Sequence, residues 1–129
     1  MTLQQLLNQW FDIAADDLEV AEGCLKNYHP PKSTIACYHA QQAAEKSLKG
    51  FLTFCDIEPP YTHNLTELCK MCMEYDPSFS KILELCDLIN PYGVITRYPK
   101  EKEITEPMAK TAISQAREVY GYCLGKIPD

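Results

Sequence analysis

The residues best suited to chemistry in this sequence are an Arg-Tyr pair and a polar stripe on one predicted helix. Arg97 adjoins Tyr98; a guanidinium can hold a phosphate through two hydrogen bonds, and a phenol ring can stack on a flat or cationic group. The stripe comprises Tyr38, His39, Gln42, Glu45, Lys46 and Lys49. At about 100° per residue, these six side chains fall within roughly a third of a helical turn. They could line a nucleotide site or a dimer groove.

Both groups also have plain structural explanations. Arg97 could pair with an acid while Tyr98 packs under its loop, and the stripe could be a solvated face on which Glu45 and Lys49 form an i,i+4 pair. We expect the stripe to be an interaction surface, because the other side of the same helix suits close packing against a neighbouring helix. That side carries Ala36, Ala40, Ala43, Ala44, Ser47, Leu48, Phe51 and Phe54.

Other reactive residues point less clearly to a site. Cys69 and Cys72 form one CxxC pair, with neither the second pair nor the nearby His pair of a structural zinc site. Asp12, Asp16 and Asp17 could bind a cation but are more simply the solvated face of a helix. We therefore predict no metal and no cofactor. The seven cysteines are scattered through helical patterns, which indicates buried, reduced thiols in a cytosolic protein.

The elements that must position these residues are helices. Prolines fall at segment edges with long proline-free runs between them, and no strand pattern occurs. The expected helices cover residues 2–27, 32–55, 64–75, 76–89 and 105–125. Residues 94–104 are expected to form an exposed, mostly polar loop. The sequence predicts an all-α, up-and-down bundle of four to five helices in a single domain, residues 1–129.

Local signals mark where three of these helices begin. Thr2 and Thr105 are typical N-caps, and Asp76 followed by Pro77 is a strong start signal. The inward face of the first helix is predicted from apolar spacing to be Leu3, Leu6, Leu7, Trp10, Ala14, Leu18, Ala21 and Leu25. The inward face of the fourth is predicted to be Ile82, Leu85, Cys86 and Ile89.

Charge restricts the classes of partner. The net charge of −6 argues against broad nucleic-acid binding, and no DNA partner is expected. Residues 31–55 and 93–104 are the net positive segments, so an anion should prefer them. No stretch approaches the ~18 apolar residues of a membrane span, and the start of the chain lacks the pattern of a signal peptide. We expect a cytoplasmic protein without a membrane partner.

Four segments, in order along the chain, resemble the HEPN family, which is named for its occurrence in higher eukaryotes and prokaryotes and for nucleotide binding. They are Trp10 with Ala15-Asp-Asp-Leu18 and Ala21; the stretch from Ala36 to Lys49, which resembles the family's second-helix signature; Thr62-His-Asn-Leu65; and Thr96-Arg-Tyr-Pro99 before an alanine-rich last helix. The resemblance implies a helical bundle that pairs into a homodimer. It also implies either an RNase, often the toxin of a toxin–antitoxin pair, or a non-catalytic module that binds a nucleotide or docks a small nucleotidyltransferase.

The arginines and histidines favour the second role. Active members of the family resemble one another in an Arg with a His a few residues after it: the Arg holds the phosphate and the His transfers a proton. Here His29, His39 and His63 all precede Arg97 and Arg117, so that order is absent.

We therefore expect a non-catalytic HEPN protein with Arg97, Tyr98 and the polar stripe as its binding residues. The alternative is a metal-independent RNase that holds the RNA phosphate with Arg97 and uses His39 or His63 as an unusual base. His63 is more simply a cap or hinge residue.

Overall fold

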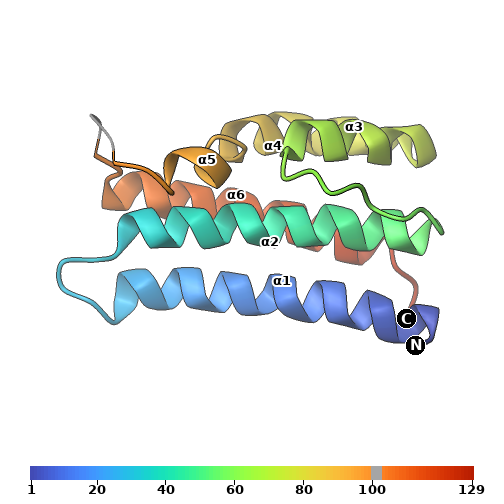
Figure 1. The fold of residues 1–129 in the computed structure, drawn as a ribbon, viewed down its shortest axis with the longest axis horizontal. Helices are drawn as coiled ribbons and strands as arrows, with labels where there is room; N and C mark the ends of the chain where they lie inside the picture. Colours follow the sequence, from blue (N-terminus) through green and yellow to red (C-terminus); the bar gives the residue numbers. More distant parts are fainter. Residues whose placement is uncertain (100–102) are drawn as a thin grey trace.

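The computed structural model describes residues 1–99 and 103–129, which form a bundle of helices without a strand (Figure 1). The long helices are α1 (Leu3–Lys26), α2 (Ser33–Phe54) and α6 (Glu106–Gly125). The shorter elements are α3 (Leu65–Tyr75), the 3₁₀ helix η1 (Pro77–Ile82), α4 (Leu83–Ile89) and α5 (Tyr92–Ile95). The predicted all-α bundle is confirmed.

Helix α2 is the central element of the bundle. It packs against α1 and α6 and also contacts α3, α4 and α5. Figure 1 shows α1 on one side of α2, α3 to α5 on the other, and α6 behind it. Fourteen of its 22 residues are buried, so only a narrow strip of this helix reaches the surface.

Side-chain caps fix the helix starts. Thr2 and Gln5 form a reciprocal capping box at α1, and Thr105 accepts from the backbone N–H of Met108 at α6. Asp76 accepts from the backbone N–H of Ser78 at η1. These three predicted caps are confirmed. They are readable in the sequence because each depends on residues within three positions of one another.

Two predictions between Asp76 and Thr105 need correction. The fourth helix begins as the 3₁₀ helix η1 before it becomes α4, and Leu85 is only half-buried. Residues 92–95 form the helical turn α5, part of which falls in the predicted loop. This turn packs on α2, a tertiary contact that no local pattern reveals. Residues 100–102 of the predicted loop lie outside the described residues.

The inward faces of α1 and α2 also differ from prediction. In α1, Phe11 is buried while Leu3 and Leu6 are exposed and Trp10 is half-buried. The helix carries two adjacent apolar strips, and its neighbours α2 and α6 cover only one of them. In α2, Phe54 at the last turn is exposed rather than packed.

Six of the seven cysteines are buried, and the seventh, Cys55, is half-buried. Burial raises the pKa of the Cys123 thiol well above its usual value. Cys69 and Cys72 belong to the core of α3. Over residues 1–99 and 103–129, no group of three or more His, Cys, Asp or Glu side chains is arranged to hold a metal ion. No helix in those ranges is long and apolar enough to cross a membrane.

Helix α1 lies close against α2 at Gly50. A Cβ atom added there would lie 2.8 Å from Cε2 and 2.9 Å from Cζ of Phe11, and 3.2 Å from Cβ of Trp10. These distances are shorter than ordinary carbon–carbon contact, and Phe11 is held in the core. Glycine at this position therefore allows α1 to lie against α2.

We predict that Gly50→Ala destabilises the protein by about 1–3 kcal/mol, because the added methyl group overpacks the α1–α2 contact. The matched control is Gly121→Ala in α6, where an added Cβ meets no atom within 4 Å. That change should stabilise by up to about 1 kcal/mol through helix propensity. Urea unfolding of both variants measures the difference. Equal changes in the free energy of unfolding at the two positions would contradict the close approach of α1 to α2 at Gly50.

Candidate binding face on α2

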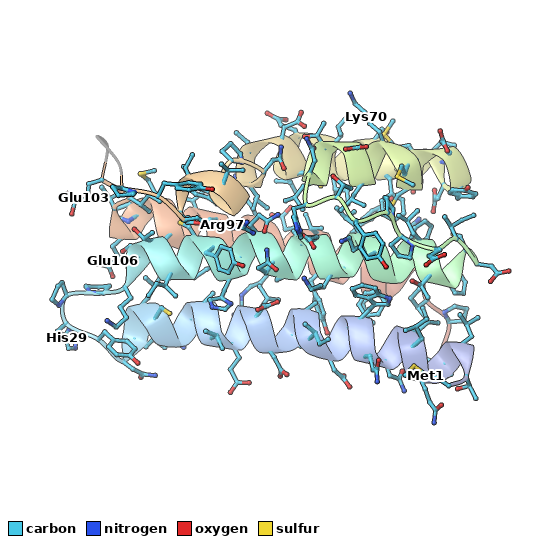
Figure 2. All side chains as sticks on the ribbon, in the orientation of Figure 1. Met1, His29, Lys70, Arg97, Glu103 and Glu106 are labelled. Atoms are coloured by element: carbon cyan, nitrogen blue, oxygen red, sulfur yellow. The ribbon has the colours of Figure 1, made fainter. Side chains whose placement is uncertain are left out.

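Arg97 and Tyr38, which were both predicted to be binding residues, are in contact. The guanidinium carbon of Arg97 lies 5.6 Å from the centroid of the Tyr38 ring, within the range of a cation–π interaction. Arg97 follows α5 and lies between that turn and α2 (Figure 2). It forms no ion pair with any carboxylate in the described part of the chain. Tyr98 next to it is 65% exposed, so it does not pack under the loop.

His39 lies on the α1 side of Tyr38. The two rings pack edge to face with centroids 5.4 Å apart. The Nδ1 atom of His39 lies 2.9 Å from Oδ1 of Asp17, which joins α2 to α1. Asp17 was predicted to be solvated, but it is half-buried in this pair. A carboxylate at Nδ1 favours the imidazole form whose Nε2 atom is free to accept a proton.

The middle of α2 holds a buried polar cluster centred on Glu45, which is 1% exposed. Its Oε2 atom lies 3.2 Å from Nζ of Lys49 and 3.4 Å from Nζ of Lys46. Its Oε1 atom lies 3.0 Å from Nδ1 of His63 and 3.5 Å from Nε2 of Gln41. Such a buried carboxylate is tolerated only when it is paired and hydrogen-bonded, and both oxygens here are satisfied.

Amide groups extend the cluster and tie a second segment to α2. Gln41 donates through Nε2 to the carbonyl of His63 at 2.9 Å and accepts from Gln42 at 2.7 Å. Lys46 donates to Oε1 of Gln42 at 3.0 Å. A Cβ atom at Gly93 would lie 2.9 Å from Cδ of Gln41, so α5 is seated directly on this network. The connection before α3 and the turn α5 therefore share one anchor on α2.

Charge governs the ionisation of Glu45. Desolvation by burial raises the pKa of its carboxyl, but the charges of Lys46 and Lys49 and the hydrogen bond from His63 outweigh it and leave the pKa lowered. Glu45 therefore stays ionised in the folded protein at neutral pH. Its contribution to stability is present above its ordinary pKa of 4.5 and is lost as the pH falls through the lowered folded-state value.

The polar stripe is thus not one continuous surface. Tyr38, His39, Gln42 and Lys46 are partly exposed, whereas Glu45 and Lys49 are buried. Glu45 and Lys49 do form the i,i+4 pair, but inside the protein rather than in solvent. The cause is the connection between α2 and α3, which covers that part of the helix through His63.

Sequence reasoning assigned no role to Gln41 and placed His63 in a cap or hinge role. The actual cap of α3 is Asn64, whose side chain accepts from the backbone N–H of Glu67 at 3.0 Å. A signal was present: Gln41 and Glu45 are polar residues four apart in an otherwise alanine-rich stretch. Helical spacing alone could not say that both are buried.

We predict that Glu45→Gln destabilises the protein by about 3 kcal/mol at neutral pH, because it leaves the buried ammonium of Lys49 without a counter-charge. The control is Glu106→Gln, which breaks the exposed i,i+4 pair with Lys110 and should cost less than about 1 kcal/mol. Denaturant unfolding at several pH values measures both. The Glu45→Gln difference should shrink as the pH falls below 4.5; a difference independent of pH would contradict the assignment.

The fold has solved relatives. The structure of TT1696 from Thermus thermophilus superposes with a TM-score of 0.77 at 23% identity, covering 94% of this chain and 98% of that one. The structure of ST0689, described as an archaeal HEPN homologue, gives a TM-score of 0.73 at 27% identity, covering 95% and 98%. A comparison with curated proteins found no significant match.

The family comparison covers nearly the whole chain. Residues 7–127 match the family model described as the HEPN domain. The matched range includes the Tyr38–Arg97 contact, the Glu45 cluster and all helices except the first turn of α1. The chain belongs to the HEPN family.

Proposed function

We propose that this protein is a non-catalytic HEPN domain that binds a nucleotide at the Arg97 end of α2 and works as a homodimer. The observation that carries the proposal is the stacking of Arg97 on Tyr38 without a carboxylate partner among the described residues. A guanidinium held by a ring keeps its N–H donors for a phosphate. Exposed Tyr98 beside it offers a ring on which a base can stack.

The histidines support a binding role rather than RNA cleavage. His63 is bound to Glu45, and His29 lies in the connection between α1 and α2 at one end of the bundle (Figure 2). None of the three histidines follows Arg97 in the sequence, where active family members carry theirs. The site therefore keeps an anion clamp without the usual proton-transfer group.

We predict that ATP or GTP raises the melting temperature of the wild-type protein, since a ligand that binds only the folded state stabilises it. Arg97→Ala should weaken binding by about tenfold to a hundredfold, the loss of one or two charge-assisted hydrogen bonds. The matched control is Arg117→Ala, which removes the only other arginine, paired with Glu22. A thermal-shift titration measures all three proteins. A nucleotide effect that survives Arg97→Ala would place the site elsewhere.

The homodimer is proposed to form through the face made by α1, α2 and α5. Leu6, Ile13 and Val20 follow one another at intervals of seven residues, so they share one strip of α1. Ile13 and Val20 are each 46% exposed. A two-fold axis on this face would set the acidic α1 of one copy against Lys46 of α2 in the other.

We predict that Ile13→Glu converts the dimer to a monomer, because it introduces a charge into the apolar strip. Leu88→Glu, at a comparably exposed position on α4, should leave the dimer intact. Sedimentation equilibrium of both variants and the wild type measures the mass. A monomeric wild type, or a dimer that tolerates Ile13→Glu, would reject this face.

The same surface would serve a small nucleotidyltransferase, the other partner that the family resemblance suggests.

A second candidate function is metal-independent RNA cleavage, which the Asp17–His39 pair favours. Asp17 orients His39 through Nδ1, and both His39 and Arg97 contact the Tyr38 ring. Because Arg97 and His39 contact the same ring, a phosphate held by Arg97 would lie near His39, the candidate base.

RNA cleavage in the presence of a chelator separates the two functions. Under this second candidate, His39→Gln and Arg97→Ala each abolish cleavage, whereas His63→Gln retains it. A wild-type protein without cleavage would reject the RNase and leave the binding module.

A further inference from the structure

A hollow of about 530 Å³ lies at the opposite end of α2 from Arg97. It is enclosed by Leu3, Leu6 and Trp10 of α1, Lys49 and Thr53 of α2, and residues 56–61 of the following connection, green at the right of Figure 1. Its volume is in the range of small-molecule sites. Lys49 is eleven residues beyond Tyr38 on the same helix, about 16 Å along the axis, so the hollow is separate from the proposed nucleotide site.

The Lys49 side of the hollow carries an unbalanced positive charge. Lys49 is 7% exposed, and its Nζ atom shares Oε2 of Glu45 with the Nζ atom of Lys46. Two ammonium groups on one carboxylate leave a net charge of about +1 even when His63 is neutral. An ammonium group has three donors, and the described residues supply Lys49 with one acceptor. An anion in the hollow would balance this charge.

Trp10 supplies an aromatic wall. Its indole Nε1 atom is buried, with almost no accessible surface, and no acceptor for it is found among the residues that the structure describes. The part of Trp10 that lines the hollow is therefore the apolar remainder of its ring. Trp10 and Lys49 line the same hollow from α1 and α2.

The other residues that line the hollow determine what kind of ligand fits in it. Leu3 and Leu6 are exposed apolar residues, and Tyr61 is 98% exposed with its ring available for stacking. Asp56 and Glu58, both exposed, add negative charge around the hollow. These two carboxylates repel a polyanion such as RNA. Because solvent screens them, they reduce the affinity for a ligand with a single buried negative charge only a little.

We propose that this hollow binds a small aromatic monocarboxylate. Its carboxylate lies against the Lys49 ammonium, and its apolar body lies between Trp10 and Tyr61. The proposal goes beyond the proposed nucleotide site and does not depend on it.

The test uses three probes of one shape: 3-phenylpropionate, its neutral amide, and the cation 3-phenylpropylamine. Trp10 is the only tryptophan, so its fluorescence reports on the hollow. We expect a saturable change with the acid and at least about tenfold weaker binding of the amide and the amine, the worth of one charge-assisted contact. No saturable response to the acid, or tighter binding of the amine, would overturn the proposal.

Lys49→Met and Lys46→Met form the matched pair of variants. Each leaves Glu45 with one lysine, but only Lys49 lines the hollow. Lys49→Met should reduce the affinity for the acid about tenfold, to that of the amide. Lys46→Met removes the excess charge but keeps the contact, so its loss should be clearly smaller, and Arg97→Ala should stay within about twofold. Equal losses in both lysine variants would overturn the proposal.

Tyr61→Ala covers the case in which Lys49→Met fails to fold. Tyr61 is almost fully exposed, so its removal should leave the fold intact. Its removal should lower the affinity for the acid about threefold to tenfold, because the stacking on the ring is lost. Unchanged affinity in a folded Tyr61→Ala protein would overturn the placement of the aromatic body.

Discussion

The charge of Glu45 constrains the rest of this molecule. A carboxylate that is 1% exposed in the middle of the central helix must be neutralised from nearby. Lys46 and Lys49 do so, and Nδ1 of His63 lies within hydrogen-bond distance of it. His63 can reach it only if the connection before α3 crosses α2, and Gln41 fixes that crossing by binding the His63 carbonyl. The fold of the segment between α2 and α3 therefore follows from one buried charge.

Because the segments that surround Glu45 cover much of the middle of α2, the accessible surface of this helix lies mainly toward its two ends. The middle of the helix is covered by the connection that His63 anchors and by α5 seated on Gln41. The accessible features of α2 include the Tyr38–Arg97 contact toward one end and the hollow beside Lys49 toward the other. One end offers a ring and a guanidinium that has no carboxylate partner among the described residues, and the other offers a buried ammonium. Both suit anions, but of different size and charge.

Local chemistry made most of the fold predictable. The caps Thr2, Asp76 and Thr105 and the proline positions define helix starts within a few residues, and small residues on α2 indicate its packing side. Burial of Glu45 was not predictable, because a helical wheel assumes one buried side whereas α2 is covered on several. The turn α5 was missed for the same reason, since its position depends on contact with α2 rather than on its own four residues.

The candidate site was predictable only in part. Arg97 and Tyr38 are far apart in the sequence and were predicted as members of two separate groups of binding residues, and the structure brings them into contact. Asp17 and His63 were assigned to solvent and to a cap, because the residues that pair with them lie on other elements. The spacing of residues within one helix does not reveal which residues of other elements they pair with.

The most direct test of a nucleotide site at the Arg97 end is an amide chemical-shift titration of the isotope-labelled protein with ATP. The account predicts that the largest shifts fall on residues 38–42 and 97–98, with residues 56–61 unaffected. Shifts confined to residues 56–61, or none at saturating ATP, would contradict it.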